Sequence, residues 1–189
     1  SNLNLVLDSR KNVRDGGGGV RLVANATYGR DVINHEREFV SGSADAEVAV
    51  EVMKPGRVLT LRGFVSDSVP LGREPVPFLE QSMLGWHNHL GFIWGRFRDE
   101  AAALAEIRYR YPIGFFLDME WVASAANVFD RKFSDFDIKK LTGSIGVGFR
   151  TRRTGLTPLE LIVALGTTRF DEAFSIDSVR VYLSTTGDL

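Results

Sequence analysis

The sequence predicts an all-β protein built as an antiparallel, up-and-down β-barrel. Three observations lead to this prediction. Apolar and polar residues alternate with a period of two along most of the chain, short and long links alternate between these segments, and the charged side chains inside the segments are arginine and carboxylate rather than lysine. Helical periodicity is hard to find. A length of 189 residues fits a single domain.

The alternation is clearest between Leu104 and Ile113. Ile107 and Tyr109 point to one face of the predicted strand, whereas Glu106 and Arg108 point to the other. The same pattern recurs in nine segments, at about 2–12, 19–28, 37–53, 57–67, 102–113, 115–127, 141–152, 157–167 and 175–185. We expect each of them to form or contribute a strand.

The links between these segments differ in length in a regular way. Tight turns are predicted at Lys54-Pro55-Gly56, Pro112-Ile113-Gly114 and Arg153-Thr154-Gly155. Longer links fall at 28–36, 67–100, 127–140 and 167–174. Short turns at one end and long loops at the other are typical of outer-membrane barrels.

The number of strands follows from parity. Bacterial single-chain barrels have an even number of strands, so we expect eight strands within residues 15–189, with a long loop at 67–100. Residues 1–14 are then an N-terminal extension or a partial edge strand. The alternative is that the chain forms half of a sixteen-stranded barrel.

The distribution of charge favours a barrel that is apolar outside. Only five of the 23 basic residues are lysine; four fall in predicted turns or loops, and Lys11 lies at the end of its segment, next to a predicted turn. A soluble β-protein usually places lysine on its solvated faces and edges. A soluble barrel or sandwich with the apolar face inside remains the alternative. In the outer-membrane interpretation the other face forms a neutralised lumen network, with these members: Arg21, Glu47, Glu51, Arg62, Glu106, Arg108, Arg110, Asp118, Glu120, Arg150, Glu160 and Arg180.

Composition argues against several functions. The net charge of −1 gives no general attraction to nucleic acid. The absence of cysteine removes thiol nucleophiles and thiolate metal sites. No apolar run is long enough for a membrane-spanning helix, and no serine sits in a nucleophile-elbow setting. We therefore predict no enzyme and no cofactor, and we identify no small-molecule substrate.

Two local clusters are candidate sites. His87 and His89 flank Asn88, but a zinc site needs a further ligand, and only His35 remains, so we predict no metal. The long loop gathers residues that we expect to form an interface with lipid or another subunit: Trp86, Leu90, Phe92, Trp94 and Phe97. An eight-stranded barrel has no room for this loop, so we expect the loop outside the lumen. Simple packing within the loop is the alternative for the aromatic residues.

The order of several short motifs resembles the bacterial surface-antigen barrels of the outer-membrane assembly-factor superfamily, related to BamA and TamA. The motifs include Gly95-Arg96-Phe97-Arg98-Asp99, Glu106-Ile107-Arg108-Tyr109-Arg110-Tyr111-Pro112-Ile113, Asn127-Val128-Phe129-Asp130 and Gly146-Val147-Gly148-Phe149-Arg150. The resemblance extends over nearly the whole chain. It implies an integral barrel of the bacterial outer membrane.

Two positions depart from the family pattern. The resemblance implies an arginine at the tip of the inward-folded loop and an aspartate on the barrel wall. This chain has Leu90 and Ser124 at those positions. Loss of both partners avoids the cost of leaving one buried charge unpaired.

These observations predict an integral outer-membrane barrel with a structural or lipid-organising role. We expect it to contact outer-membrane lipid, to self-associate as a homo-oligomer and to lack an open pore. The alternatives are an assembly or insertion factor for outer-membrane proteins and a membrane anchor for a separate passenger or enzyme domain.

Overall fold

A computed structural model describes residues 1–10, 18–30, 38–72, 74–86, 88–151 and 159–185. The chain is all-β and forms one antiparallel sheet of nine strands, in the order β1-β2-β3-β4-β7-β8-β9-β10-β11. The strands of this sheet are β1 (Asn2–Asp8), β2 (Gly19–Arg30), β3 (Glu38–Glu51), β4 (Val58–Pro70), β7 (Ala101–Pro112), β8 (Leu117–Phe129), β9 (Thr142–Thr151), β10 (Glu160–Arg169) and β11 (Ile176–Ser184). The antiparallel meander is therefore confirmed.

The strand count differs from the expectation of eight. All seven residues of β1 pair with β2, from Asn2 opposite Thr27 to Asp8 opposite Arg21. The rule that closed barrels have an even number of strands does not apply to this sheet, because no pairing joins β1 to β11 in the described residues. The sheet has two free edges, and no closed barrel is formed.

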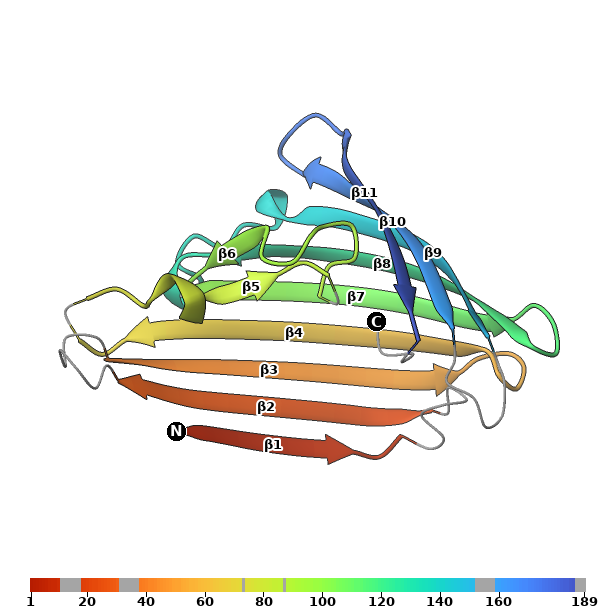
Figure 1. Cartoon of the computed structure of the whole chain (residues 1–189), viewed down its shortest axis with the longest axis horizontal. Coiled ribbons are helices and arrows are strands. Elements are labelled where there is room, and N and C mark those ends of the chain that lie inside the picture. The colour runs from red at the N-terminus through yellow and green to blue at the C-terminus, as the bar shows by residue number, and fades with distance from the viewer. Residues whose placement is uncertain (11–17, 31–37, 73, 87, 152–158, 186–189) are drawn as a thin grey trace.

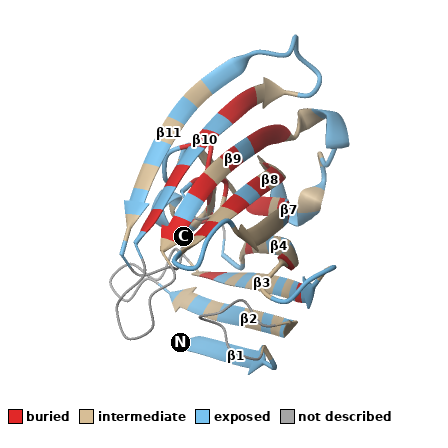
Figure 2. Ribbon diagram, turned by 90° about the vertical axis from the view of Figure 1, so that its right-hand side faces the viewer, coloured by how far each residue is buried: buried red, intermediate tan, exposed pale blue. Residues whose placement is uncertain are grey.

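The sheet is strongly curved, as Figures 1 and 2 show. Its concave face is covered in part by the segment between β4 and β7. This segment contains the short turn η1 (Phe78–Glu80) and a hairpin of β5 (Ser82–Leu84) and β6 (Phe97–Asp99). The link between β8 and β9 contains two further short turns, η2 (Arg131–Phe133) and η3 (Ile138–Lys140).

The apolar core lies between this covering segment and the concave face. One buried cluster joins Leu84 of β5 to Ala102, Leu104 and Ala126 on the sheet. Figure 2 shows burial concentrated on β7 to β10, whereas β1 and β11 are mostly exposed or half-buried. Large apolar side chains on the convex face remain exposed, such as Ile107 at 45% and Leu61 at 53%.

Glycine permits the tight link between β3 and β4. Gly56 has φ of 80°, a conformation that residues with a Cβ rarely adopt. The predicted turn at Lys54-Pro55-Gly56 is thus confirmed, whereas the turn at Arg153-Thr154-Gly155 lies outside the described residues. Within the described part of the chain, no helix has the length and apolar character needed to cross a membrane.

Candidate functional site

The concave face is divided into three regions of different chemistry. Strand register places charged side chains near the short-turn end of the sheet, buried hydroxyls beneath the covering segment on β8 to β11, and uncharged polar side chains on β2 to β4 near the long-loop end. We call these regions the charged zone, the anchoring zone and the polar ladder. Each is defined by its residues below.

The charged zone is centred on Glu120, which is 1% exposed. Arg108 Nη1 lies 3.1 Å from Glu120 Oε1, and Arg110 Nε lies 3.0 Å from Oε2. Arg108 also contacts Glu106 at 3.3 Å. These four residues belong to β7 and β8, whose register brings Arg110 directly opposite Glu120. Buried carboxylates are stabilised only when they are paired in this way.

The other predicted members of the charge network are spread along the same face. Register places Arg150 opposite both Asp118 and Glu160, and all three are buried. Arg180 lies opposite Ala164 on the outer strand β11, and Glu51 is exposed at the end of β3.

Near β1 the pairs include residues that the sequence did not suggest. Arg62 binds Asp45 at 2.6 Å, and Glu47 binds Arg10 at 2.8 Å. Arg21 lies 3.9 Å from Asp8. Arg10 and Asp8 fall in the segment that we expected to be an extension, which is why their part in the network was missed.

The anchoring zone fixes the covering segment through His89. Its Nδ1 lies 3.0 Å from Ser124 Oγ, and its Nε2 lies 3.0 Å from Thr142 Oγ1. The ring stacks on Phe92 with centroids 4.8 Å apart. Burial lowers the pKa of His89 to about 3 because the imidazolium would lose its hydration. The residue is therefore a neutral imidazole that bridges two hydroxyls, which is a structural role.

Backbone groups next to His89 are also bound by the sheet. Ser144 Oγ accepts from the Gly91 amide at 2.7 Å, and Tyr182 donates to the Leu90 carbonyl at 2.6 Å. Ser178 donates to the Gly91 carbonyl. The approach is so close that a Cβ on Gly91 would lie 2.6 Å from the Cα of Gly166. Only glycine fits at this contact.

The expectation that the long loop lies outside the concave space is wrong. Leu90 is 1% exposed and packs against Val122, Ile162 and Ala164 on the concave face. The volume argument assumed a closed barrel of eight strands, whereas the open sheet of nine leaves room for the loop. The desolvation argument assumed that nothing would compensate the loop, but hydroxyls of the sheet satisfy its backbone groups.

Leu90 and Ser124 both remain at the contact between loop and sheet. An apolar side chain in an apolar pocket and a His–Ser hydrogen bond occupy the region where the resemblance implied a charged pair. Sequence reasoning missed Thr142, Ser144, Ser178 and Tyr182 as anchoring residues. The only available signal was that positions 90 and 124 are both uncharged. This indicated that the loop still contacts the sheet there, but without a charged pair.

The aromatic residues of the loop separate into two groups. Phe92 is fully buried, and Phe97 packs edge-on against it with centroids 4.8 Å apart. Trp86 and Trp94 remain 44% and 53% exposed. Of the five residues expected to form an interface, Leu90 and Phe92 are therefore buried by contacts within the chain, whereas the two tryptophans remain accessible.

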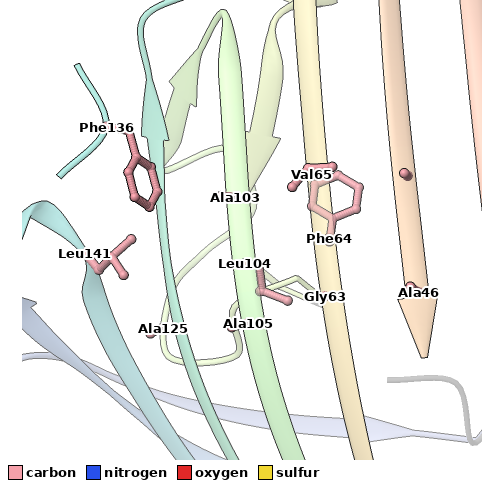
Figure 3. A pocket seen from close by; sticks show the side chains of 11 residues that line it. Ala46, Gly63, Phe64, Val65, Ala103, Leu104, Ala105, Ala125, Phe136 and Leu141 are labelled. Carbon is pink, nitrogen blue, oxygen red and sulfur yellow. The ribbon is translucent and has the colours of Figure 1, made fainter. Parts of the chain in front are cut away.

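The convex face carries a shallow apolar groove of about 290 Å³. Figure 3 shows its floor of small residues, including Ala46, Gly63, Ala105 and Ala125, with Phe136 and Leu141 at one side. The floor results from register, since these four small residues face one another across β3, β4, β7 and β8. None of the described residues that line the groove has a hydrogen-bonding or charged side chain that could do chemistry.

Neither face shows a metal centre within the described residues, where no three His, Cys, Asp or Glu side chains are grouped to hold an ion. His35 and His87, which we considered as ligands, lie outside those residues. No protein-family model matches this chain, and no curated protein matches it. The site therefore has to be interpreted from its own chemistry.

Proposed function

We propose that this chain forms a wall of an integral barrel in the bacterial outer membrane, with a structural or lipid-organising role and no open pore. The observation that carries the proposal is the convex face. The four cross-strand rows through Ala103, Ala105, Ile107 and Tyr109 contain no charged side chain on any described strand. Many of their residues are large, apolar and exposed, such as Leu61 at 53% and Val181 at 65%.

The height of this apolar face supports the membrane proposal. Along β7, the residues from Ala103 to Tyr111 span about 26 Å at roughly 3.3 Å per residue, and the next row, through Ala101, contains Asp67. A strand tilted by about 40° would bring this to about 20 Å across the membrane, somewhat below the usual height of about 25 Å of the apolar band in outer-membrane barrels. Tyr109, Tyr111 and Trp121 lie toward the short-turn end, where an aromatic girdle is expected.

The covering segment supports the absence of an open pore. It reaches from β4, where Asn88 Oδ1 accepts from Arg62 at 2.7 Å, to β11, where Tyr182 binds Leu90. The paired charges of the charged zone occupy the remaining concave face on β7 and β8. A wall built in this way fills much of the space that a channel would need.

The free edges β1 and β11 support association with further strands. Lipid offers no hydrogen bonds to an unpaired strand edge, so a membrane-spanning sheet has to be completed. The partners that we propose are other copies of this chain and outer-membrane lipid.

Quenching of tryptophan fluorescence by brominated lipids tests the membrane proposal. A protein retaining only Trp121, on the convex face, should be quenched strongly after folding into vesicles. A protein retaining only Trp94, on the concave side, is the matched control and should be quenched weakly. Equal, weak quenching of both would refute the membrane proposal.

One observation favours a second function, in which the protein assists assembly of other outer-membrane proteins. An exposed sheet edge can bind an incoming strand through main-chain hydrogen bonds, and this sheet has two such edges. The edge-blocking experiment described in the Discussion distinguishes this function from the first.

A further inference from the structure

The polar ladder is an ordered array of uncharged hydrogen-bonding side chains on the concave face. Register aligns them in two rows across β2, β3 and β4. One row is Thr27, Ser41 and Ser68, and the other is Asn25, Ser43 and Ser66. The array thus presents two parallel lines of hydroxyl and amide groups to one space.

The covering segment turns this array into a cavity. The polar ladder forms one wall, with Phe64 at its border, and residues of the covering segment, including Ser82, Asn88 and Trp94, form the other. The cavity is open on one side and has a volume of about 260 Å³, just below the range of roughly 300–1,000 Å³ for small-ligand sites.

The ladder's hydrogen-bonding capacity is only partly used. Ser66 Oγ is buried and has no hydrogen-bond partner among the described residues. Asn25 donates to Ser43 Oγ at 3.3 Å, a long contact, and Ser68 donates to the Glu80 carbonyl at 3.2 Å. Buried hydroxyls normally have a partner, so Ser66 has hydrogen-bonding capacity left over at the wall of this cavity.

The lining also selects the kind of molecule. Among the described residues that line the cavity, Glu80 is the single charged one, and none is a lysine or arginine. An anion would therefore find no counter-charge, and an apolar chain would leave the hydroxyls unpaired. A neutral molecule with many hydroxyl groups satisfies both conditions.

Trp94 adds the second feature that such a molecule requires. Its side chain is 53% exposed and lines the cavity. A pyranose ring has hydroxyls at its rim and polarised C–H groups on its face. These C–H groups pack well against the electron-rich face of an indole ring.

We propose that this cavity binds one unit of a neutral saccharide, through the polar ladder and Trp94. The cavity lies at the long-loop end of the sheet. The sugar belongs either to a free oligosaccharide or to the headgroup of a glycolipid. This binding is additional to the proposed membrane role, and it is testable in detergent whether or not the sheet spans a membrane.

Ligand-observed saturation-transfer NMR tests the proposal on the intact chain. The protein is held in lauryldimethylamine oxide rather than an alkyl glycoside, whose sugar headgroup would compete. The probes are glucose, galactose, N-acetylglucosamine and maltotriose. At least one should bind saturably with a Kd of about 1 mM or tighter, as expected for a ligand of this size.

Two substitutions locate the binding. Ser66→Ala removes the vacant hydroxyl and should weaken binding about three- to tenfold. Trp94→Ser removes the stacking surface and should weaken it about tenfold. Ser134→Ala and Trp121→Ser, which change the same residue types outside the cavity, are the matched controls and should leave the Kd unchanged. Far-UV circular dichroism confirms that each variant is folded.

A second arm identifies the source of the sugar. A digalactosyl glycolipid, added as mixed micelles with the same detergent, should displace the best probe if the headgroup is the ligand. If it does not, while the probe still binds, the free oligosaccharide is the ligand. Absence of saturable binding by all probes and by the glycolipid overturns the proposal, as does equal binding by wild type and both cavity variants. Either result leaves the lipid-quenching experiment on the convex face unaffected.

Discussion

His89 determines how the long loop meets the sheet at the scale of a single residue. A neutral imidazole can donate one hydrogen bond and accept another, and Ser124 and Thr142 supply the two partners. Because burial holds its pKa at about 3, the ring stays neutral throughout the ordinary pH range. The loop contact is therefore insensitive to pH near neutrality.

We predict that replacing His89 by alanine destabilises the protein by about 2–4 kcal/mol. The change removes the hydrogen-bond partner of the Ser124 hydroxyl and creates a cavity beside Phe92. Denaturant unfolding in detergent measures it. Ser134→Ala, at a surface turn, is the control and should cost less than about 0.5 kcal/mol. An equal, small effect at both positions would show that the imidazole contributes nothing.

The same residue predicts a specific dependence of stability on pH. The folded-state pKa of His89, about 3, lies below the ordinary value of 6.5. Between these values the unfolded chain binds a proton that the folded chain does not, so stability falls as pH drops from about 6.5 toward 3. His89→Gln, which cannot titrate, should lose less stability over that interval. Parallel stability curves for the two proteins would contradict the prediction.

The covering segment, with its hairpin, is the element whose position the sequence did not reveal. Tyr182 donates to Leu90, and the phenol ring packs against the same apolar cluster. We predict that Tyr182→Phe raises hydrogen exchange in β5 and β6 by about three- to tenfold, because a net contribution of about 1 kcal/mol to closing the segment is lost. Tyr111→Phe, on the convex face, should leave exchange in the hairpin unchanged. No difference between the two variants would exclude Tyr182 as an anchor.

The convex face is the second element-scale feature, and it carries the membrane prediction. Arginine at Ile107 or Val163, which are 45% and 38% exposed, should destabilise the protein in lipid vesicles by about 2–4 kcal/mol near the bilayer midplane. Met53→Arg, at a turn where the side chain is 91% exposed, should be neutral. Ala164 is unsuitable as a mild control, since it is fully buried beneath Leu90 and arginine there would overpack the site. Unchanged folding into vesicles after both strand substitutions would contradict the membrane prediction.

At the scale of the whole molecule, the two free edges run in the same direction. A meander of nine antiparallel strands places its first and last strands parallel. Joining β1 to β11, within one chain or between two copies related by an axis along the barrel, would therefore create a parallel seam. A fully antiparallel barrel needs an odd number of further strands. A sixteen-stranded barrel, of which this chain would form about half, meets this condition and remains a prediction.

The free edge of β1 can be blocked selectively. Both ends of the β1 segment are hydrogen-bonded to β2. The Tyr28 amide donates to the Ser1 carbonyl, and the Ser9 amide donates to the Val20 carbonyl, each at 2.9 Å. The alternation of an antiparallel ladder then directs the amide of Val6 to the free edge. Val6→Pro should abolish strand addition there without removing a bond to β2.

Two measurements show the effect of Val6→Pro. One is the particle mass in mild detergent, and the other is the rate at which a client barrel protein folds in the presence of this protein. If the edge serves self-association, Val6→Pro should reduce the mass. If it serves assembly of other proteins, the substitution should slow client folding while the mass stays constant. Val6→Thr, which keeps the amide, is the control for both. A proline variant identical to the control in both measurements would exclude a role for this edge.

The sequence by itself determined the strands and their faces. Period-two alternation reports the backbone geometry of a strand directly, so the meander and the separation of apolar from charged faces could be predicted from residues such as Ile107 and Arg108. Glycine and proline marked the turn at Lys54-Pro55-Gly56 for a similarly local reason. Tertiary structure alone decided that the sheet stays open, because edge pairing depends on curvature and on strands far apart in the chain. It also decided the place of the long loop, since the contacts of His89 with Ser124 and Thr142 join residues 35 and 53 positions apart, and no local pattern records which distant hydroxyl satisfies a buried imidazole.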